Sequence, residues 1–177
     1  MRIVLDTNCL LAIIPKVSPF RLVFDAFRFG QFELAVSSEI LLEYQEIAAQ
    51  KMTPQSSDNI IELLLKQPNT IKTEIFYRWQ LITADPDDNK FTDTAISSGA
   101  DYLITNDSHF RVLRAIPFPK VIVLSIQEFA TLLQNRKRVA YSLTRFRRGL
   151  GYDPCFPSFR LPRSARLRQP GCFLWCG

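Results

Sequence analysis

The sequence has few of the residues that metal sites and covalent enzymes commonly use. It contains one histidine, His109, in 177 residues, and its four cysteines include no Cys-x-x-Cys pair. These absences argue against a structural zinc site, whose Cys and His ligands come in closely spaced pairs. The sequence also lacks a P-loop, a Gly-x-Gly-x-x-Gly pattern and a Gly-x-Ser-x-Gly turn. The usual nucleotide-binding and serine-hydrolase signatures are therefore excluded.

Long apolar runs are missing as well. None approaches the roughly 18 residues that a membrane-spanning helix needs. The first apolar run, residues 9–14, follows Asp6 and Asn8, which does not fit a secretory signal, so a disulfide framework is not expected either. Hydrophobic residues make up 47% of the chain, enough for a sizeable core. We expect a cytoplasmic globular protein with no membrane segment.

Basic residues are concentrated at one end of the chain. Residues 1–134 hold 12 Lys and Arg against 16 Asp and Glu, whereas residues 135–177 hold 10 against a single Asp. The sequence therefore predicts an acidic domain over residues 1–134 and a basic, irregular and poorly ordered extension over residues 135–177. The extension is interpreted either as an arm that binds nucleic acid through its phosphates or, with preference, as an accidental extension of the reading frame.

The acidic domain shows strands alternating with helices. Strands are expected at residues 2–5, 32–36, 102–105 and 121–124, and helices at about 18–29, 38–51, 57–66, 88–98 and 126–133; residues 71–82 are ambiguous. The helix at 57–66 has an almost wholly apolar centre, which indicates burial on more than one side. This order predicts a three-layer α/β/α fold with a central parallel sheet. Ligands of such sheets bind beyond the carboxyl ends of the strands.

Acidic residues follow two of these strands. Asp6 ends the first strand and Asp107 follows the strand at 102–105. Each is explained equally well as the cap of a following turn or helix. Two carboxylates at equivalent places on one sheet edge are nevertheless a candidate functional pair.

Further acids are expected near the same edge. The stretch DPDDNKFTD, residues 85–93, holds four aspartates, and favourable helix-start positions account for one or two of them. Glu43 lies about one turn inside the helix at 38–51, from where its side chain leans back toward the strand ends. Four carboxylates would repel one another unless they were neutralised, and two Mg²⁺ or Mn²⁺ ions carry the matching charge. Such an ion pair stabilises the attacking and leaving oxygens of a phosphodiester displacement.

Four fragments in order resemble the PIN domain family, especially its single-domain, VapC-like toxins of toxin–antitoxin pairs. They are RIVLDTN at the start, SSEILLEY, DPDDNKFTDTAISSGADYLIT and NDSHF, and together they cover about residues 1–134. The resemblance implies a PIN-like fold and an Asp–Glu–Asp–Asp metal site for Mg²⁺ or Mn²⁺, with one or two ions bound. The four acids would be Asp6, Glu43, Asp88 and Asp107.

The resemblance also implies further residues, an activity and partners. Asp93 is an expected additional metal ligand, while Thr7, Asn8 and Ser37 match positions that orient the first acid or a water. The implied activity is endonuclease cleavage of single-stranded RNA, leaving 5′-phosphate and 3′-hydroxyl ends. A homodimer and inhibition by a small cognate antitoxin are implied too. We expect Lys90 to pair with neighbouring aspartates rather than with phosphate, and His109 to be an exposed residue at a helix start.

Two alternatives accompany this hypothesis. A catalytically silent PIN-like module that binds RNA or protein is the runner-up, although the complete acid set argues against it. The start of the sequence also resembles the aspartyl-nucleophile phosphatases. Those enzymes need a second Asp two residues after the first, where this chain has Asn8.

Overall fold

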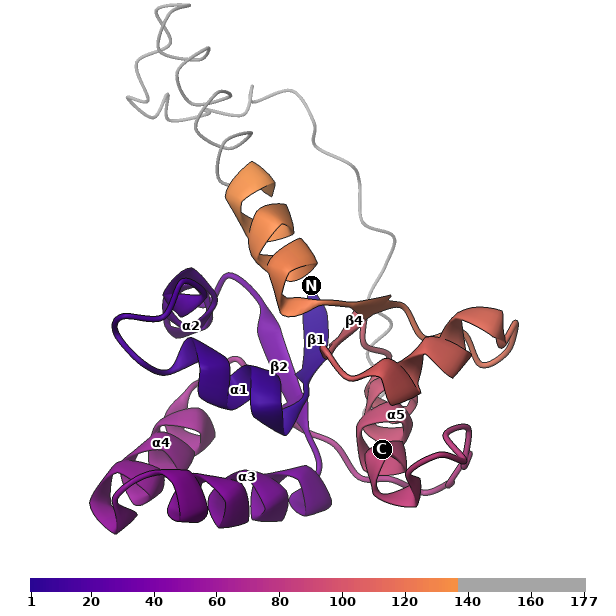
Figure 1. Cartoon of the computed structure of the whole chain (residues 1–177), viewed down its shortest axis with the longest axis horizontal. Helices are drawn as coiled ribbons and strands as arrows, with labels where there is room; N and C mark the ends of the chain where they lie inside the picture. The colour runs from indigo at the N-terminus through magenta and orange to yellow at the C-terminus, as the bar shows by residue number, and fades with distance from the viewer. Residues whose placement is uncertain (137–177) are drawn as a thin grey trace, which may run out of the picture. The chain divides into compact units, whose positions relative to one another are not determined.

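Five parallel strands form one sheet at the centre of the computed structural model, which describes residues 1–136 (Figure 1). The strands lie in the order β3-β2-β1-β4-β5, and all four neighbouring pairs are parallel. Their bounds are β1 Arg2–Leu5, β2 Glu33–Val36, β3 Thr70–Lys72, β4 Tyr102–Ile104 and β5 Val123–Leu124. The predicted α/β fold with a central parallel sheet is confirmed. The predicted poor order of the tail falls on residues 137–177, outside the described part of the chain.

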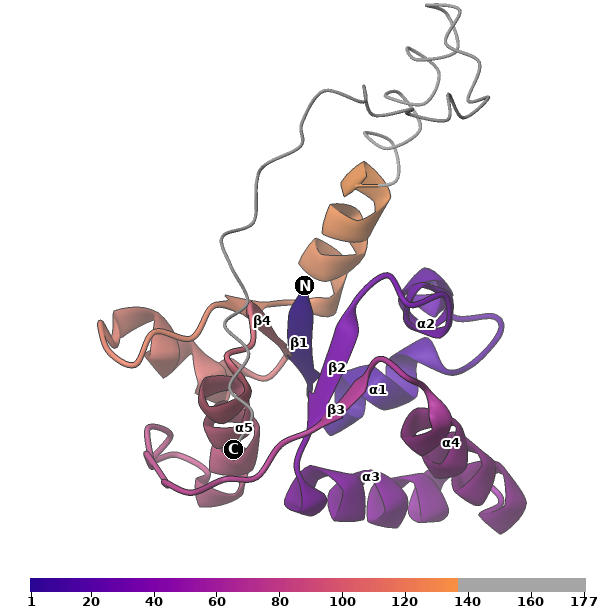
Figure 2. The same cartoon turned by 180° about the vertical axis from the view of Figure 1, so that it is seen from behind.

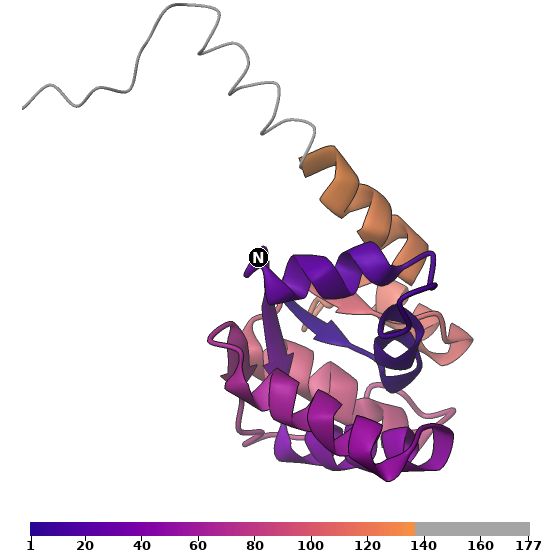
Figure 3. The ribbon, with the colours of Figure 1, turned by 90° about the vertical axis from the view of Figure 1, so that its left-hand side faces the viewer.

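Helices connect the strands and flank the sheet. They are α1 Thr7–Ile13, α2 Arg21–Arg28, α3 Ser38–Lys51, α4 Pro54–Lys66 and α5 Asn89–Ser98, with 3₁₀ segments η1 Pro86–Asp88 and η2 Ser108–Ala115. Helix α1 lies in front of β1 and β2 in Figure 1 and behind them in Figure 2. Helix α5 packs on β1, β2 and β4, and α3 contacts α1, α4 and α5. Residues 126–136 form the orange helix in Figure 3.

The central strands are buried because helices cover them. Ile3, Val4 and Leu5 of β1 are at most 1% exposed, as are Leu103 and Ile104 of β4. Continuous apolar runs of this kind are typical of parallel strands, which face apolar helices on both sides. The register sets Leu5 beside Ile104, so the residues that follow these two strands also lie side by side.

Several boundaries differ from the sequence expectation. Helix α1 was not predicted, because it has only seven residues and the apolar run at residues 9–14 shows no helical period. Helix α2 begins at Arg21 rather than at Pro19, and Ser18 Oγ instead donates to the carbonyl of Ala12 while accepting from the N–H of Phe20. Within the ambiguous region only Thr70–Lys72 is a strand, and the chain then runs to Pro86 without a helix or strand.

Two helices begin with serine caps. Ser37 caps α3 by accepting from the N–H of Ile40. Ser125 caps the helix at 126–136, and Glu128 returns the bond to the Ser125 N–H at 2.7 Å, which is a capping box. Among residues 1–136, no helix has both the length and the apolar character that crossing a membrane requires.

Candidate active site

Asp6 lies directly beyond β1, at the carboxyl edge of the sheet. Its N–H bonds to the carbonyl of Ile104, which extends the β1–β4 ladder by one residue. The side chain is only 7% exposed. One carboxylate oxygen accepts from the Thr105 hydroxyl at 2.9 Å, and the other accepts from the N–H of Asn8 at 3.4 Å, which caps α1. Asp6 therefore caps α1, as one interpretation expects, and it also stands at the strand edge, so its role in a functional site stays a prediction.

Thr105 connects Asp6 to a second acid. The threonine is 3% exposed. While its hydroxyl donates to Asp6, the same oxygen accepts from the N–H of Asp107 at 3.0 Å. Asp107 in turn caps η2, with its carboxylate accepting from the His109 N–H at 2.8 Å. This network fixes Asp107 beside the end of β1.

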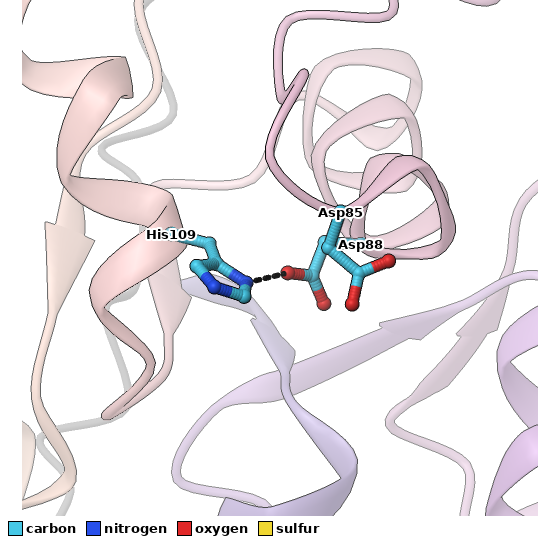
Figure 4. A group of neighbouring side chains, drawn as sticks. All are labelled: Asp85, Asp88 and His109. Carbon is cyan, nitrogen blue, oxygen red and sulfur yellow. Dashed lines mark hydrogen bonds and ion pairs between the residues drawn. The ribbon is translucent and has the colours of Figure 1, made fainter.

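Asp88, in η1, approaches His109 of η2. Its Oδ2 lies 3.2 Å from His109 Nδ1 (Figure 4). Asp85, Asp88 and His109 each offer an atom within 4.8 Å of the other two. His109 also lies 3.6 Å from Asp107. The histidine is exposed, as expected, but it lies between two acids of the predicted site.

Glu43 reaches the same edge from α3. Its Oε1 accepts from the Thr7 hydroxyl at 2.7 Å, which ties it to the residue next to Asp6. Its Oε2 forms an ion pair with Lys90 Nζ at 2.6 Å. Lys90 thus pairs with an acid, as expected, but its partner is Glu43 and not a neighbouring aspartate.

The buried groups near Asp6 have shifted pKa values. Burial raises the pKa of Asp6 above its ordinary value, nearby Glu43 and Asp107 add to the rise, and the Thr105 hydrogen bond opposes it. Burial likewise raises the pKa of Asp88, and Asp85 and Asp107 contribute to that rise. Burial, together with Asp6, raises the pKa of Cys9 to about 12, so this thiol is protonated at neutral pH and is no nucleophile.

Asp93 has different surroundings. It is 2% exposed, and its Oδ1 accepts from the N–H of Trp79 at 3.0 Å. Burial raises the pKa of Asp93, while Arg78 lowers it and Glu39 raises it. These contacts attach the segment after β3 to α5. A role for Asp93 in metal binding stays a prediction.

Asn89 fixes the aspartate-rich turn itself. Its side-chain amide donates to the carbonyls of Ile82 and Pro86, and its amide oxygen accepts from the N–H of Ile82 at 2.9 Å. Asn89 is 7% exposed. Three bonds from one side chain therefore hold the turn at the start of α5, with Asp85 and Asp88 on it.

A continuous series of contacts thus links the four predicted acids. It runs from Glu43 through Thr7 to Asp6, and from Asp6 through Thr105, Asp107 and His109 to Asp88. The acids come from four different elements, yet they share one edge of the sheet. Among residues 1–136, the possible ligand atoms that lie within 4.8 Å of one another belong to Asp85, Asp88 and His109, a group that includes one of the four predicted acids.

Sequence reasoning missed some polar residues of this edge. Thr105 reads as an ordinary strand residue, and its role depends on the β1–β4 register. Tyr44 was assigned to an apolar helix face, but its buried hydroxyl donates to the carbonyl of Leu5. The signal for Asp85 was present in DPDDN, although nothing in the sequence distinguished it from Asp87, which is exposed.

The donor set fits a hard divalent cation. Carboxylate oxygens are the ligands that Mg²⁺ and Mn²⁺ prefer. The raised pKa values of Asp6 and Asp88 show that burial and neighbouring negative charge disfavour their ionised forms, and a nearby cation reverses that effect. Burial, together with the repulsion among these acids, therefore favours a metal ion at this edge.

Comparisons with known proteins identify the family. A family model described as "PIN domain" matches residues 2–109, and the chain belongs to the PIN domain family. None of the curated proteins matches the chain.

Three solved structures are similar in fold. The structure titled VapBC2 from Rickettsia felis bound to a DNA fragment from their promoter has 20% identity and a TM-score of 0.52, covering 71% of this chain and 98% of that one. DNA-bound VapBC from Salmonella typhimurium has 16% identity, the same coverages and a TM-score of 0.47. The T. brucei RRP44 PIN domain has 10% identity and a TM-score of 0.42, covering 81% and 87%. The predicted resemblance to the PIN domain family is confirmed by the family model, and the Rickettsia felis structure shares the fold.

Proposed function

We propose that the chain is a metal-dependent endoribonuclease that cleaves single-stranded RNA, and that it is the toxin of a toxin–antitoxin pair. The observation that carries the proposal is the burial of Asp6 beside Glu43 and Asp107, with the pKa of Asp6 raised. A carboxylate in such a place destabilises the fold unless a bound cation offsets the cost. Membership of the PIN domain family supports the same conclusion.

The roles of the acids follow from their positions. Asp6, Asp88 and Asp107 would hold the main Mg²⁺ or Mn²⁺ ion, and Glu43, together with Asp93 as predicted, would help to hold a second. Bound ions lower the pKa of a nucleophilic water and stabilise negative charge on the phosphate. Thr105 and Thr7 act as positioning residues, because their hydroxyl groups fix the orientation of Asp6 and Glu43. Outer partners of this kind commonly affect metal affinity by about 10–100-fold.

The proposed role of His109 is to position Asp88 and Asp107, not to bind the metal ion itself. His109 contacts Asp88 through its ring and Asp107 through its backbone N–H. It therefore connects the two acids that come from η1 and the start of η2. Lys90 neutralises one oxygen of Glu43, which reduces the negative charge that an approaching phosphate meets.

We also propose a protein partner, from the titles of the similar structures. The Rickettsia felis and Salmonella typhimurium structures are titled as VapBC assemblies. A small cognate antitoxin that covers the acidic edge would inhibit the enzyme, and a homodimer is the oligomeric state that accompanies this proposal.

The deciding experiment is cleavage of an end-labelled single-stranded RNA with Mg²⁺, Mn²⁺ or EDTA. The wild-type chain should cut only with a divalent ion, and Asp6→Asn should lower the rate by at least about a hundredfold, because a ligand and its charge are lost together. Asp101→Asn is the matched control, since Asp101 is an exposed acid that accepts from the N–H of Arg2, outside the acid network. Cleavage in EDTA, or cleavage unaffected by Asp6→Asn, would contradict the proposal. Binding of RNA without any cleavage would favour a silent module.

A further inference from the structure

Aromatic rings gather on the surface beside α5. Tyr77, Trp79 and Phe118 stack edge to face, with ring centroids 4.9 Å apart for Tyr77 and Trp79 and 6.0 Å apart for Trp79 and Phe118. Tyr77 is 64% exposed and Phe118 is 78% exposed, while Trp79 is half-buried between them. Exposed apolar rings that contact one another indicate an interaction surface, whereas single exposed apolar residues scattered over a surface do not.

The ring cluster, Tyr77, Trp79 and Phe118, is held in place by the same elements that carry the acids. The Trp79 N–H bonds to Asp93 of α5, five residues after Asp88. Phe118 follows η2, which begins beside Asp107 and contains His109. The two segments also meet where Phe91 packs edge to face on Phe110, at 6.3 Å between centroids. The segment that leads into α5 therefore meets the segment that contains η2 at two places, the ring cluster and the Asp88–His109 contact.

The backbone around the rings has a defined shape. Gln80 has a φ of 50°, a value that non-glycine residues adopt only where neighbouring contacts hold them. Such contacts lie on both sides of it, at Trp79 with Asp93 and at Ile82 with Asn89. A ligand would thus find the rings already in position.

Local charge indicates which partner these rings suit. Residues 70–82 and 108–122 hold one acidic side chain, Glu74, and five exposed basic ones: Lys72, Arg78, Arg111, Arg114 and Lys120. Arg78 forms an ion pair with Glu39 of α3, and the other four account for the excess of positive charge. The acidic domain has an excess of negative charge elsewhere, with 16 acidic against 12 basic residues over residues 1–134. Basic residues interleaved with aromatic rings favour a polyanion that carries flat groups. An apolar protein segment would gain no electrostatic stabilisation from these basic residues.

We propose that the ring cluster is a stacking platform for unpaired bases of single-stranded RNA, with basic residues of the same two segments contacting its phosphates. Bases stack on aromatic side chains with little sequence preference, while basic groups follow the backbone. The identity of the partner rests on the proposed ribonuclease function. The platform would hold the RNA strand on α5 about one to two helical turns from Asp88.

Trp79 provides a direct probe. The chain has two tryptophans, Trp79 and Trp175, so Trp175→Phe leaves Trp79 as the only indole. The full-length chain with Trp175→Phe and Asp6→Asn, in EDTA, is titrated with an oligouridylate of about ten nucleotides, a length within the usual site size. Stacking predicts saturable quenching of Trp79 fluorescence. An abasic oligomer of the same length should bind roughly tenfold more weakly or worse, as lost base stacking implies.

Ring variants complete the test. Phe118→Ala and Tyr77→Ala should each weaken oligouridylate binding roughly tenfold. Phe29→Ala is the matched control, because Phe29 is 79% exposed at the end of α2 and lies outside the ring cluster. Equal affinity for the abasic oligomer, or unchanged affinity in both ring variants, would overturn the platform, because the basic residues alone would then account for binding.

Two further outcomes separate this inference from the proposed function. Base-dependent quenching without cleavage in any metal supports the platform and overturns the ribonuclease. Metal-dependent cleavage with a KM that is insensitive to Phe118→Ala and Tyr77→Ala overturns the platform and leaves the ribonuclease. If the ring variants change the sedimentation mass of the protein and not its RNA affinity, the surface joins copies of the chain, and the platform is again overturned.

Discussion

Asp6 and Thr105, 99 residues apart in the sequence, share a hydrogen bond of 2.9 Å at the end of two neighbouring strands. The bond exists because β1 and β4 pair in a register that sets Leu5 beside Ile104. Thr105 also accepts from the Asp107 N–H, so one hydroxyl positions two of the four acids of the candidate site.

Thr105→Val tests this arrangement. The substitution removes the donor to the buried Asp6 and leaves the partly buried Asp107 N–H without its acceptor, so we expect a loss of about 1–3 kcal/mol in the free energy of unfolding. RNA cleavage should fall about 10–100-fold, as for other residues that orient metal ligands. Urea denaturation and initial cleavage rates measure the two effects.

Thr92→Val is the matched control for that substitution. Thr92 is fully buried, and its hydroxyl has no hydrogen-bond partner among residues 1–136. Replacing it with valine should leave the free energy of unfolding unchanged or raise it, because an unsatisfied buried hydroxyl is removed. Equal losses in both variants would show that the Thr105 bonds have no special role.

The raised pKa of Asp6 predicts how stability depends on pH without metal. Because the folded-state pKa lies above the ordinary value of 3.8, ionisation of Asp6 costs stability as the pH rises through the folded-state pKa. Asp6→Asn removes this cost, so the metal-free variant should be more stable than the wild type at neutral pH.

The gain should be largest at pH 7 and should shrink as the pH falls, disappearing below 3.8, where Asp6 is protonated in both folded and unfolded chains. Thermal unfolding in EDTA across this pH range measures the difference. A gain that does not change with pH would show that burial of the charge is not its cause.

Substitution of Asp88 or of its neighbour Asp87 should have different effects on the stabilisation of the protein by a divalent metal ion. In the wild type, a divalent ion at about a hundredfold excess over its Kd should add roughly 2.7 kcal/mol to stability. Asp88→Asn should remove at least half of this gain, because Asp88 faces His109 and Asp107. Asp87→Asn makes the same charge change one residue earlier, on an exposed side chain, and should keep the full gain. Thermal shifts with Mg²⁺ and Mn²⁺ provide the measurement, and equal responses would rule out a specific role for Asp88.

The Lys90–Glu43 ion pair should contribute more than an exposed pair. Its side chains are 20% and 23% exposed, so Lys90→Met leaves a half-buried carboxylate unpaired, and we expect a loss of about 1–3 kcal/mol in metal-free stability. Lys66→Met breaks the exposed pair with Glu62 and should have little effect. Added Mg²⁺ should reduce the loss in Lys90→Met, because a cation near Glu43 replaces the missing charge. An equal loss with and without Mg²⁺ would place Glu43 outside the metal site.

The order of strands and helices could be predicted because each buried strand is a continuous apolar run, and α3 and the helix at 126–136 begin with serine caps. Helix α1 could not, since it has only seven residues and its apolar run shows no helical period, and β3 is only three residues long. The acids were found because carboxylates after a strand are unusual. Thr105 and His109 were not assigned their roles because these arise from the strand register and from the meeting of η1 with η2. Sequence spacing does not contain that information.

Asn89 has a consequence for how the site meets its cation. Because one amide fastens the turn between Ile82 and Pro86, Asp85 and Asp88 keep their places by ordinary amide chemistry and need no ion to fold them. Because the turn is already ordered, cation binding carries little entropic cost for the loop, and the affinity depends mainly on the metal–ligand contacts. Aspartate at this position could not supply the two donated bonds, and the acidic turn would then depend on the metal for its shape.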